Sequence, residues 1–311
     1  MQCPFCTAVL PDDDLFCEEC GKALTTPHPA VCVCGAPEAD LDDDGYCLQC
    51  GRRCRPAPED HVEFELSTGF AAVTDRGLRH PRNEDRCRIA EEQNRRILVL
   101  CDGVSSSANA HLAAEAACQA IMNSVSAGAT LAAAVRDACQ AVAELGNTIA
   151  ETAPSTTLVA AIVEESTIQI AWMGDSRAYW IADSASDQLT ADHSWLNETI
   201  AAGTISYAEA SQSPSSHGIT RWLGADAAPD MVPEFREFHV PGPGWLLLCS
   251  DGLWNYAPQM EEIARLVFPK DQEGAAPFDT SALELCRRLV SFANDRGGQD
   301  NVSVALLRFE S

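Results

Sequence analysis

The chain is poor in basic residues, and lysine is nearly absent from it. Its 311 residues include 21 lysines and arginines against 46 aspartates and glutamates, which gives a formal net charge of −25. Lysine occurs only at Lys22 and Lys270, and the densest basic cluster, "GRRCR", lies beside several acids. Because nucleic acid is repelled by such a chain unless a basic patch is set apart, we expect no nucleic acid partner.

Long apolar runs are also missing. No segment approaches the roughly 18–20 apolar residues that a membrane-spanning helix needs. The first residues, "MQCPFCTAVL", lack the basic start and apolar centre of a signal peptide. We therefore expect a protein with no membrane association and a cytoplasmic location.

The 15 cysteines are not distributed as in a disulfide-stabilised fold. Six are scattered through apolar strands and helices, where a free thiol packs as a small hydrophobic group. The other nine lie within the first 54 residues, at Cys3, Cys6, Cys17, Cys20, Cys32, Cys34, Cys47, Cys50 and Cys54. This division favours a reducing compartment and a metal-binding head.

The cysteine-rich head predicts two zinc ribbons, over residues 1–25 and 26–55. Zn²⁺ takes four soft ligands in a tetrahedron, and each C-x2-C turn places two sulfurs on one edge of it. The first predicted ligand set is Cys3, Cys6, Cys17 and Cys20, and the second is Cys32, Cys34, Cys47 and Cys50. Cys54 is an alternative to Cys32 or Cys34. About two structural zinc ions are expected, and since residues 1–60 hold 12 acids and 4 bases, the head suits protein contact or structural capping.

The remainder of the chain predicts a mixed α+β domain. The Pro-rich stretch at 56–66 indicates a linker before a domain over 67–311. Strand-like segments come in consecutive groups, an Ala-rich region at 108–152 predicts a pair of helices, and a last helix is expected over 281–296. This order favours antiparallel sheets covered by helix pairs over a doubly wound parallel sheet.

Five aspartates stand at strand ends or in turns. Their segments are "RNEDR", "LCDGV", "MGDSRAY", "CSDGL" and "GGQDNVSV", which contain Asp85, Asp102, Asp175, Asp251 and Asp300. Like charges gathered in one cleft repel unless a cation holds them. Hard oxygen ligands select Mg²⁺ or Mn²⁺ over Zn²⁺, so the pattern predicts a carboxylate metal site.

Eight motifs follow one another along the chain: "TDRG…NED", "LCDG", "STT", "GDSRAY", "LTADHSW", "GITRWLG", "LLLCSDGL" and "GGQDNVSV". Their sequence and order resemble the metal-dependent protein phosphatase family, also called phosphatase 2C. The resemblance covers about residues 69–309. It implies a sandwich of two antiparallel β-sheets flanked by helix pairs. It also implies a bacterial-type protein serine/threonine phosphatase in which a hydroxide held by two metal ions attacks the phosphorus.

The resemblance also implies roles for individual residues. Asp102 matches the carboxylate that bridges two metals, Gly103 the carbonyl ligand beside it, and Asp251 and Asp300 the ligands of the second metal. Glu84 and Asp85 match an acidic pair that holds metal-bound water, and Asp175 matches a ligand of a third, weaker metal. The implied catalytic residues are thus Asp85, Asp102, Asp251 and Asp300, and the implied cofactors are two or three Mn²⁺ or Mg²⁺ ions.

Some positions depart from the family pattern. The family usually places a phosphate-binding arginine where this chain has His80, so His80, Arg79 and Arg82 are the candidates for that role. The segment at 201–221 matches the flap of bacterial members and is expected to touch substrate.

Two alternatives stay open: a zinc-ribbon partner-binding protein with a weakly active or sensory phosphatase fold, and a phosphatase dedicated to one regulatory phosphoprotein. The expected partners are phosphorylated proteins, in particular bacterial Ser/Thr kinases and their substrates.

Overall fold

The computed structural model describes most of the chain after residue 31. The described residues are 32, 34–42, 45–51, 54, 57–92, 94–148, 153–183, 186–203, 205–210, 212–213, 215, 218–228, 231–268 and 280–310. The chain divides into two compact units, Met1–Pro58 and Glu59–Ser311. The first predicted zinc ribbon, with Cys3, Cys6, Cys17 and Cys20, lies outside the described residues. Among the residues described, no helix is long and apolar enough to cross a membrane.

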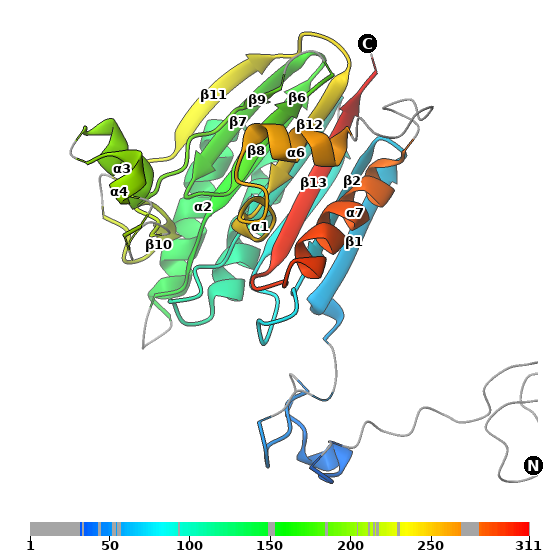
Figure 1. The fold of residues 1–311 in the computed structure, drawn as a ribbon, viewed down its shortest axis with the longest axis vertical. Helices are drawn as coiled ribbons and strands as arrows, with labels where there is room; N and C mark the ends of the chain where they lie inside the picture. The colour runs from blue at the N-terminus through cyan, green and yellow to red at the C-terminus, as the bar shows by residue number, and fades with distance from the viewer. Residues whose placement is uncertain are drawn as a thin grey trace, which may run out of the picture. The chain divides into compact units, whose positions relative to one another are not determined.

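The second unit is built on two antiparallel sheets and a short two-stranded ribbon (Figure 1). The six-stranded sheet has the order β1-β2-β13-β12-β8-β9, and the five-stranded sheet the order β11-β7-β6-β4-β3. The ribbon pairs β10 with β5. The strands are β1 (His61–Ser67), β2 (Phe70–Asp75), β3 (Arg86–Glu92), β4 (Arg95–Cys101), β5 (Ser155–Thr156), β6 (Leu158–Glu164), β7 (Thr167–Met173), β8 (Arg177–Ile181), β9 (Asp187–Gln188), β10 (Leu223–Gly224), β11 (Glu234–His239), β12 (Gly244–Cys249) and β13 (Val302–Phe309).

Helices cover the outer faces of both sheets. They are α1 (Ala110–Ser126), α2 (Leu131–Gly146), α3 (Trp195–Ala201), α4 (Tyr207–Ala210), α5 (Asp251–Trp254), α6 (Met260–Val267) and α7 (Ala282–Asp295), with short 3-10 turns at Glu38–Asp40 and Pro58–Asp60. Apolar side chains of α1 and α2 pack on β4, β6 and β7. Those of α5, α6 and α7 pack on β2, β8, β12 and β13. The predicted helix pair and last helix are therefore present, and the fold class is confirmed.

The space between the two sheets is filled by alternate residues of the central strands. Leu98 and Leu100 of β4 face Leu246 and Leu248 of β12 in one buried cluster. The intervening residues Ile97 and Val99 point instead to the helix pair α1 and α2. A strand that is buried on both faces reads as a continuous apolar run, which is why "ILVLC" and "WLLLC" show no polar alternation.

The first strands differ from the sequence expectation. "FELSTGFAAVTD" contributes to two paired strands, β1 and β2. β1 occupies most of the stretch 56–66 that was expected to be a linker, and the second unit begins at Glu59. Its residues Glu63, Glu65 and Ser67 leave β1 only half-buried at a sheet edge. Such a polar edge strand has too few apolar positions to be distinguished from a linker by composition.

Candidate active site and cysteine cluster

Asp102 follows the last residue of β4 and is held by the neighbouring strand. Its backbone carbonyl accepts hydrogen bonds from Thr157 N at 2.7 Å and Thr156 Oγ1 at 2.9 Å. Its backbone N–H donates to Thr157 Oγ1 at 3.2 Å. Thr157 Oγ1 also lies 2.8 Å from Ser176 Oγ. The backbone of Asp102 is thus fixed on both sides, and its half-buried carboxylate reaches the cavity described below.

The glycines after Asp102 and Asp251 make room for backbone from other loops. A Cβ on Gly103 would lie 2.8 Å from the carbonyl oxygen of Glu84. A Cβ on Gly252 would lie 1.9 Å from the carbonyl oxygen of Asn301. Each glycine therefore lets another segment with candidate metal ligands come close to its Asp-Gly pair. Segment 84–85 approaches Gly103, and segment 300–301 approaches Gly252.

The other predicted carboxylates also stand at strand ends. Asp251 begins α5, two residues after the end of β12, and Asp300 comes two residues before β13. Asp175 lies in the turn between β7 and β8 and is buried. Its carbonyl oxygen accepts a hydrogen bond of 3.0 Å from Trp254 Nε1, which fixes the turn against α5.

These residues share one cavity of about 550 Å³. Five predicted residues are in its lining: Asp102, Gly103, Asp175, Asp251 and Asp300. The rest of the lining comprises Val104, Ser105, Ser106, Ser107, Ala153, Ser155, Thr157, Gly218, Ile219, Trp222 and Asp226. A second cavity of about 650 Å³ near Ser67 and Arg308 has none of the predicted site residues in its lining. The structure thus brings four predicted aspartates to one cavity, whereas Glu84 and Asp85 are not in its lining and Trp222 and Asp226 were not among the predicted site residues.

The carboxylates raise one another's pKa values. Burial raises the pKa of Asp102 well above its usual range, and the charges of Asp85 and Asp251 act in the same direction. Burial likewise raises the pKa of Asp251 well above its usual range, with Asp175 and Asp300 contributing. Burial together with Asp192 raises the pKa of Asp175 to about 7. Such a cluster is stable in its ionised form only when a cation offsets the charge.

Asp85 is the most deeply buried of these acids, with 1% of its surface exposed. Neither of its carboxylate oxygens has a hydrogen-bond partner among the described residues. Burial raises the pKa of Asp85 to about 6, although the nearby hydroxyls of Ser250 and Ser303 act to lower it, and the negative charge of Asp300 adds to the rise. A deeply buried carboxylate beside other carboxylates fits a divalent cation of the Mg²⁺ or Mn²⁺ type.

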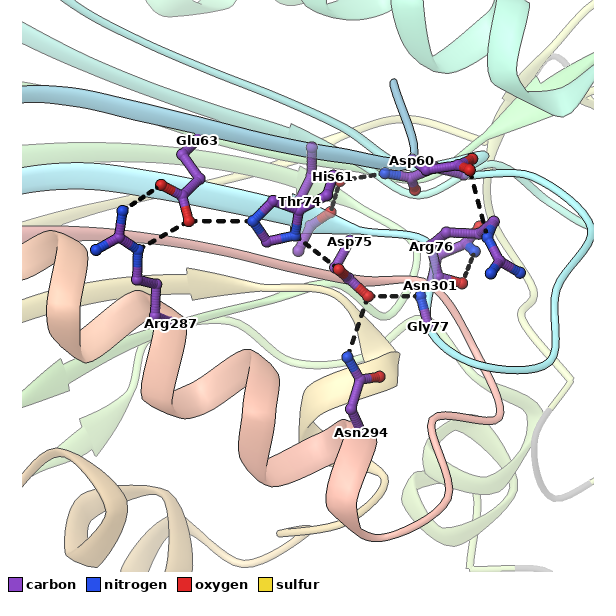
Figure 2. Close-up of polar contacts among 12 residues, drawn as sticks. Asp60, His61, Glu63, Thr74, Asp75, Arg76, Gly77, Arg287, Asn294 and Asn301 are labelled. Carbon is purple, nitrogen blue, oxygen red and sulfur yellow. Dashed lines mark hydrogen bonds and ion pairs between the residues drawn. The ribbon is translucent and has the colours of Figure 1, made fainter. Parts of the chain in front are cut away.

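The loop that carries Glu84 and Asp85 is fastened by the buried side chain of Asn301. Its Nδ2 donates to the carbonyl oxygens of Arg76 at 2.8 Å and Arg82 at 3.1 Å, and its Oδ1 accepts from Glu84 N at 2.8 Å. Figure 2 shows Asn301 beside Arg76 at the start of this loop. The residue next to Asp300 thus sets the path of the opposite loop.

The same loop is also tied to β1 and α7. Asp75 Oδ1 accepts from Gly77 N at 2.8 Å and from Asn294 Nδ2 at 3.1 Å. Its Oδ2 lies 2.7 Å from His61 Nδ1, as Figure 2 shows. The edge strand β1 therefore helps to place the site loop.

The three candidates for phosphate binding are not in the cavity lining of the described residues. His80 Nε2 lies 3.2 Å from Asp300 Oδ1, so its nearest partner is a carboxylate of the site. The guanidinium of Arg82 lies against the ring of His111, with nitrogen separations of 3.2 and 3.3 Å. The backbone N–H of Arg79 donates to Gly298 O at 3.2 Å.

A buried ion pair supports the turn of Asp175. Arg177 donates to both carboxylate oxygens of Asp192, at 2.9 and 2.7 Å, and its guanidinium lies 3.8 Å from the centre of the Trp254 ring. Burial opposes the charge of Arg177, but Asp192 raises its pKa above the usual range. The motifs "GDSRAY" and "LTADHSW" thus meet in space, and a local sequence pattern does not reveal that pairing.

The predicted flap segment, 201–221, is described only in part. It includes the end of α3, the short helix α4, and Gly218 and Ile219, which line the cavity. Ser194 forms a bridge with Ile219, so this end of the segment is anchored next to α3.

In the first unit, four cysteines form one cluster. The sulfurs of Cys32, Cys34, Cys47 and Cys50 all lie within 4.8 Å of one another. Cys32 Sγ is 3.4 Å from Cys50 Sγ, and Cys34 Sγ is 3.5 Å from Cys47 Sγ. Burial acts to raise the pKa of Cys47, but the backbone amides of Cys50 and Gln49 outweigh it and bring that pKa to about 7. Cys54 packs beside the cluster.

Comparison with known proteins agrees with this site. The family model of protein phosphatase 2C matches residues 78–285. The serine/threonine phosphatase stp of Listeria welshimeri is 30% identical over 259 residues, which is 79% of this chain and 95% of the relative.

Solved structures share the fold. The serine/threonine phosphatase Stp1 of Staphylococcus aureus superposes with a TM-score of 0.68 and 29% identity, over 81% of this chain and 98% of that one. The catalytic domain of the phosphatase PstP, in complex with two manganese ions, superposes with a TM-score of 0.63 and 24% identity, over 81% of this chain and all of that one. The chain therefore belongs to the protein phosphatase 2C family of metal-dependent serine/threonine phosphatases.

Proposed function

We propose that the acidic cavity is the catalytic centre of a Mn²⁺- or Mg²⁺-dependent phosphatase that removes phosphate from serine and threonine side chains of proteins. The observation that carries this assignment is the convergence on one cavity of carboxylates with raised pKa values. A fold has no reason to gather such groups for stability, because each one costs free energy until a cation arrives.

The residues that would hold the ions are four aspartates of the cavity lining together with the adjacent acidic pair of the 84–85 segment. They are Glu84, Asp85, Asp102, Asp175, Asp251 and Asp300, with the carbonyl of Gly103. When bound, Mn²⁺ or Mg²⁺ neutralises phosphoryl charge and acidifies water for attack on phosphorus. All the ligands are oxygens, as these hard cations prefer.

The protein's own contribution is to position these groups. Thr156 and Thr157 fix the backbone of Asp102, and Asn301 holds the loop of Asp85 against Asp300. The carboxylates must be ionised to bind cations, so the reaction depends on their deprotonation. The described cavity lining contains no lysine, arginine or histidine, which leaves the metal ions as the main recognition element for phosphate.

His80 is the best of the three candidates for an auxiliary phosphate contact. Its imidazole is already beside Asp300, whereas the guanidinium of Arg82 is against His111. Arg79 and Arg82 remain candidates if the loop shifts when substrate binds. A protonated His80 would donate to a phosphate oxygen or to Asp300.

The assignment is tested by hydrolysis of a phosphothreonine peptide in Mn²⁺. We expect activity in wild type that EDTA removes, and loss of at least about 100-fold in Asp251→Asn, because a metal ligand is lost. The matched control is Asp187→Asn, since Asp187 is an exposed residue paired with Arg236 outside the cavity. Wild-type protein that is inactive in both Mn²⁺ and Mg²⁺ would instead support a sensory or partner-binding phosphatase fold.

We further propose that the cluster of Cys32, Cys34, Cys47 and Cys50 binds one structural Zn²⁺. Four sulfurs within 4.8 Å of one another suit tetrahedral zinc. Elemental analysis should find about two zinc ions per chain if Cys3, Cys6, Cys17 and Cys20 form a second site. A content near one would restrict zinc to the described cluster, and none would refute both sites.

The proposed partners are bacterial Ser/Thr kinases and their phosphorylated substrates in the cytoplasm, with the zinc ribbons recruiting or positioning one of them. A panel of phosphoproteins would distinguish broad activity from a phosphatase dedicated to one regulatory protein.

A further inference from the structure

The lining of the acidic cavity also contains side chains that phosphate hydrolysis does not require. We propose that two of them, Asp226 and Trp222, bind a lysine or arginine side chain of the phosphoprotein, close to the phosphorylated residue. The enzyme would therefore prefer basic phosphorylation sites. This inference rests on the phosphatase function proposed above and names the class of substrate that the site takes.

The Asp226 carboxylate is held in place although the residue is exposed. Its Oδ1 accepts hydrogen bonds from Trp222 Nε1 at 3.0 Å and from Ser155 Oγ at 3.2 Å. A Cβ on Gly224 would lie 2.6 Å from Asp226 Oδ1 and 2.7 Å from Ser155 Oγ, so glycine leaves the space that this arrangement uses. Oδ2 accepts no hydrogen bond from the described residues, and it is available to a ligand.

The platform that carries Asp226 is joined to Asp102. Gly224 in β10 pairs with Ser155 in β5, and the adjacent Thr156 donates its hydroxyl to the carbonyl oxygen of Asp102 at 2.9 Å. The position of Asp226 relative to Asp102 is therefore fixed by the bonds that both segments make with β5. A peptide whose phosphate lies at the Asp102 end of the cavity would present a neighbouring side chain to the Asp226 end.

The negative charge of the cavity lining favours a positively charged ligand. The described cavity lining has five carboxylates and no lysine or arginine. Asp102, Asp175, Asp251 and Asp300 are assigned to metal ions that offset their charge, whereas Asp226 has no such partner. A carboxylate fixed beside an indole offers an ion pair and a cation–π contact to one lysine or arginine side chain.

Asp226 is a poor candidate for a further metal ligand. Divalent hard cations require several oxygen ligands from the protein or from water, with strict geometry for Mg²⁺. One oxygen of Asp226 is already occupied by two donors, and the nearest side chains contribute a hydroxyl and an indole rather than a second carboxylate. The net charge of −25 also draws basic peptides toward the molecule.

The test uses phosphothreonine peptides that are identical except for arginine, alanine or glutamate at one position within three residues of the phosphothreonine. In wild type we expect kcat/KM to be about 5- to 20-fold higher for the best arginine peptide than for its glutamate counterpart. Asp226→Asn should reduce this ratio toward 1, and Asp226→Lys should invert it. Asp226→Glu should retain a ratio above 1, and Asp187→Asn should leave the ratio as in wild type.

Four outcomes would overturn the proposal. Equal rates for arginine and glutamate peptides at every position in active wild-type enzyme would remove the subsite while leaving the phosphatase function intact. A ratio that persists in Asp226→Lys would assign the preference to other residues. A rise in the Mn²⁺ concentration needed for half-maximal activity of Asp226→Asn would identify Asp226 as a metal ligand instead. Wild-type enzyme that hydrolyses neither the peptides nor p-nitrophenyl phosphate would refute the phosphatase function itself, and the subsite with it.

Discussion

Replacing Asp85 with asparagine should make the metal-free protein more stable while it removes activity. Asp85 is buried, both of its oxygens lack a partner among the described residues, and burial raises its pKa from 3.8 to about 6. Asparagine has nearly the same shape and no charge. The substitution therefore removes an electrostatic cost that only a bound cation would otherwise offset.

The size of the effect follows from the pKa shift. A shift of about two units corresponds to about 3 kcal/mol at 1.36 kcal/mol per unit. Because the folded-state pKa of Asp85 lies above the unfolded value, the folded wild type holds its proton to higher pH. Its stability consequently falls as the pH rises from about 4 to about 6. The advantage of Asp85→Asn should be complete at pH 8, about half as large at pH 5, and absent below both pKa values.

Urea denaturation in EDTA, followed by tryptophan fluorescence, measures this difference. All six tryptophans lie between residues 172 and 254, so the signal reports on the phosphatase unit alone. With an m-value of about 3 kcal/mol/M, the midpoint at pH 8 should rise by about 1 M. Saturating Mn²⁺ should reverse the order, because wild type gains more from the ion.

The control is Asp187→Asn, whose exposed ion pair with Arg236 contributes less than about 1 kcal/mol. An Asp85→Asn protein whose midpoint in EDTA at pH 8 equals or falls below that of wild type would refute the reasoning. The same holds if the advantage were independent of pH.

Three further predictions concern the backbone, the ions and the cysteines. Gly252→Ala should lower the free energy of unfolding by about 1–3 kcal/mol, because the new Cβ would lie 1.9 Å from Asn301 O. Urea denaturation measures this change, and an unchanged midpoint would contradict the prediction. Mn²⁺ affinity measured by calorimetry should fall at least about 10-fold between pH 8 and pH 6. The pKa of Asp175 is raised to about 7, those of Asp102 and Asp251 are also raised, and protons compete with the ion for these carboxylates; equal affinities would count against them as ligands. Cys47→Ser should lose one zinc ion by elemental analysis and keep the wild-type rate on p-nitrophenyl phosphate, whereas retention of zinc would exclude Cys47 as a ligand.

The parts of the structure that could be predicted depend on local patterns. Asp102 and Asp251 each end an apolar run, and a run buried on both faces is visible without knowledge of its neighbours. The Ala-rich helix pair and the last helix, which begins after the N-cap Ser281, have equally local signals.

The parts that could not be predicted depend on contacts between distant segments. β1 is a polar edge strand, so its composition resembles that of a linker. Asp226 lies after a "WLG" segment with no acidic pattern, and its importance comes only from the pairing of Gly224 with Ser155. His80 likewise has a partner, Asp300, that is more than 200 positions away in the sequence.

The two Asp-Gly pairs connect the stability of the fold with metal binding. Gly103 admits the carbonyl of Glu84, and Gly252 admits that of Asn301, so close backbone packing brings the acidic segments together. Packing of that kind is rigid, since a carbonyl that is in contact with a glycine Cα cannot move away without disturbing the strands beside it. The carboxylates therefore cannot relieve their repulsion by moving apart, and their pKa values rise instead. It follows that enlarging either glycine should relax the repulsion and weaken metal binding together, whereas neutralising an aspartate should weaken metal binding and increase the stability of the metal-free protein.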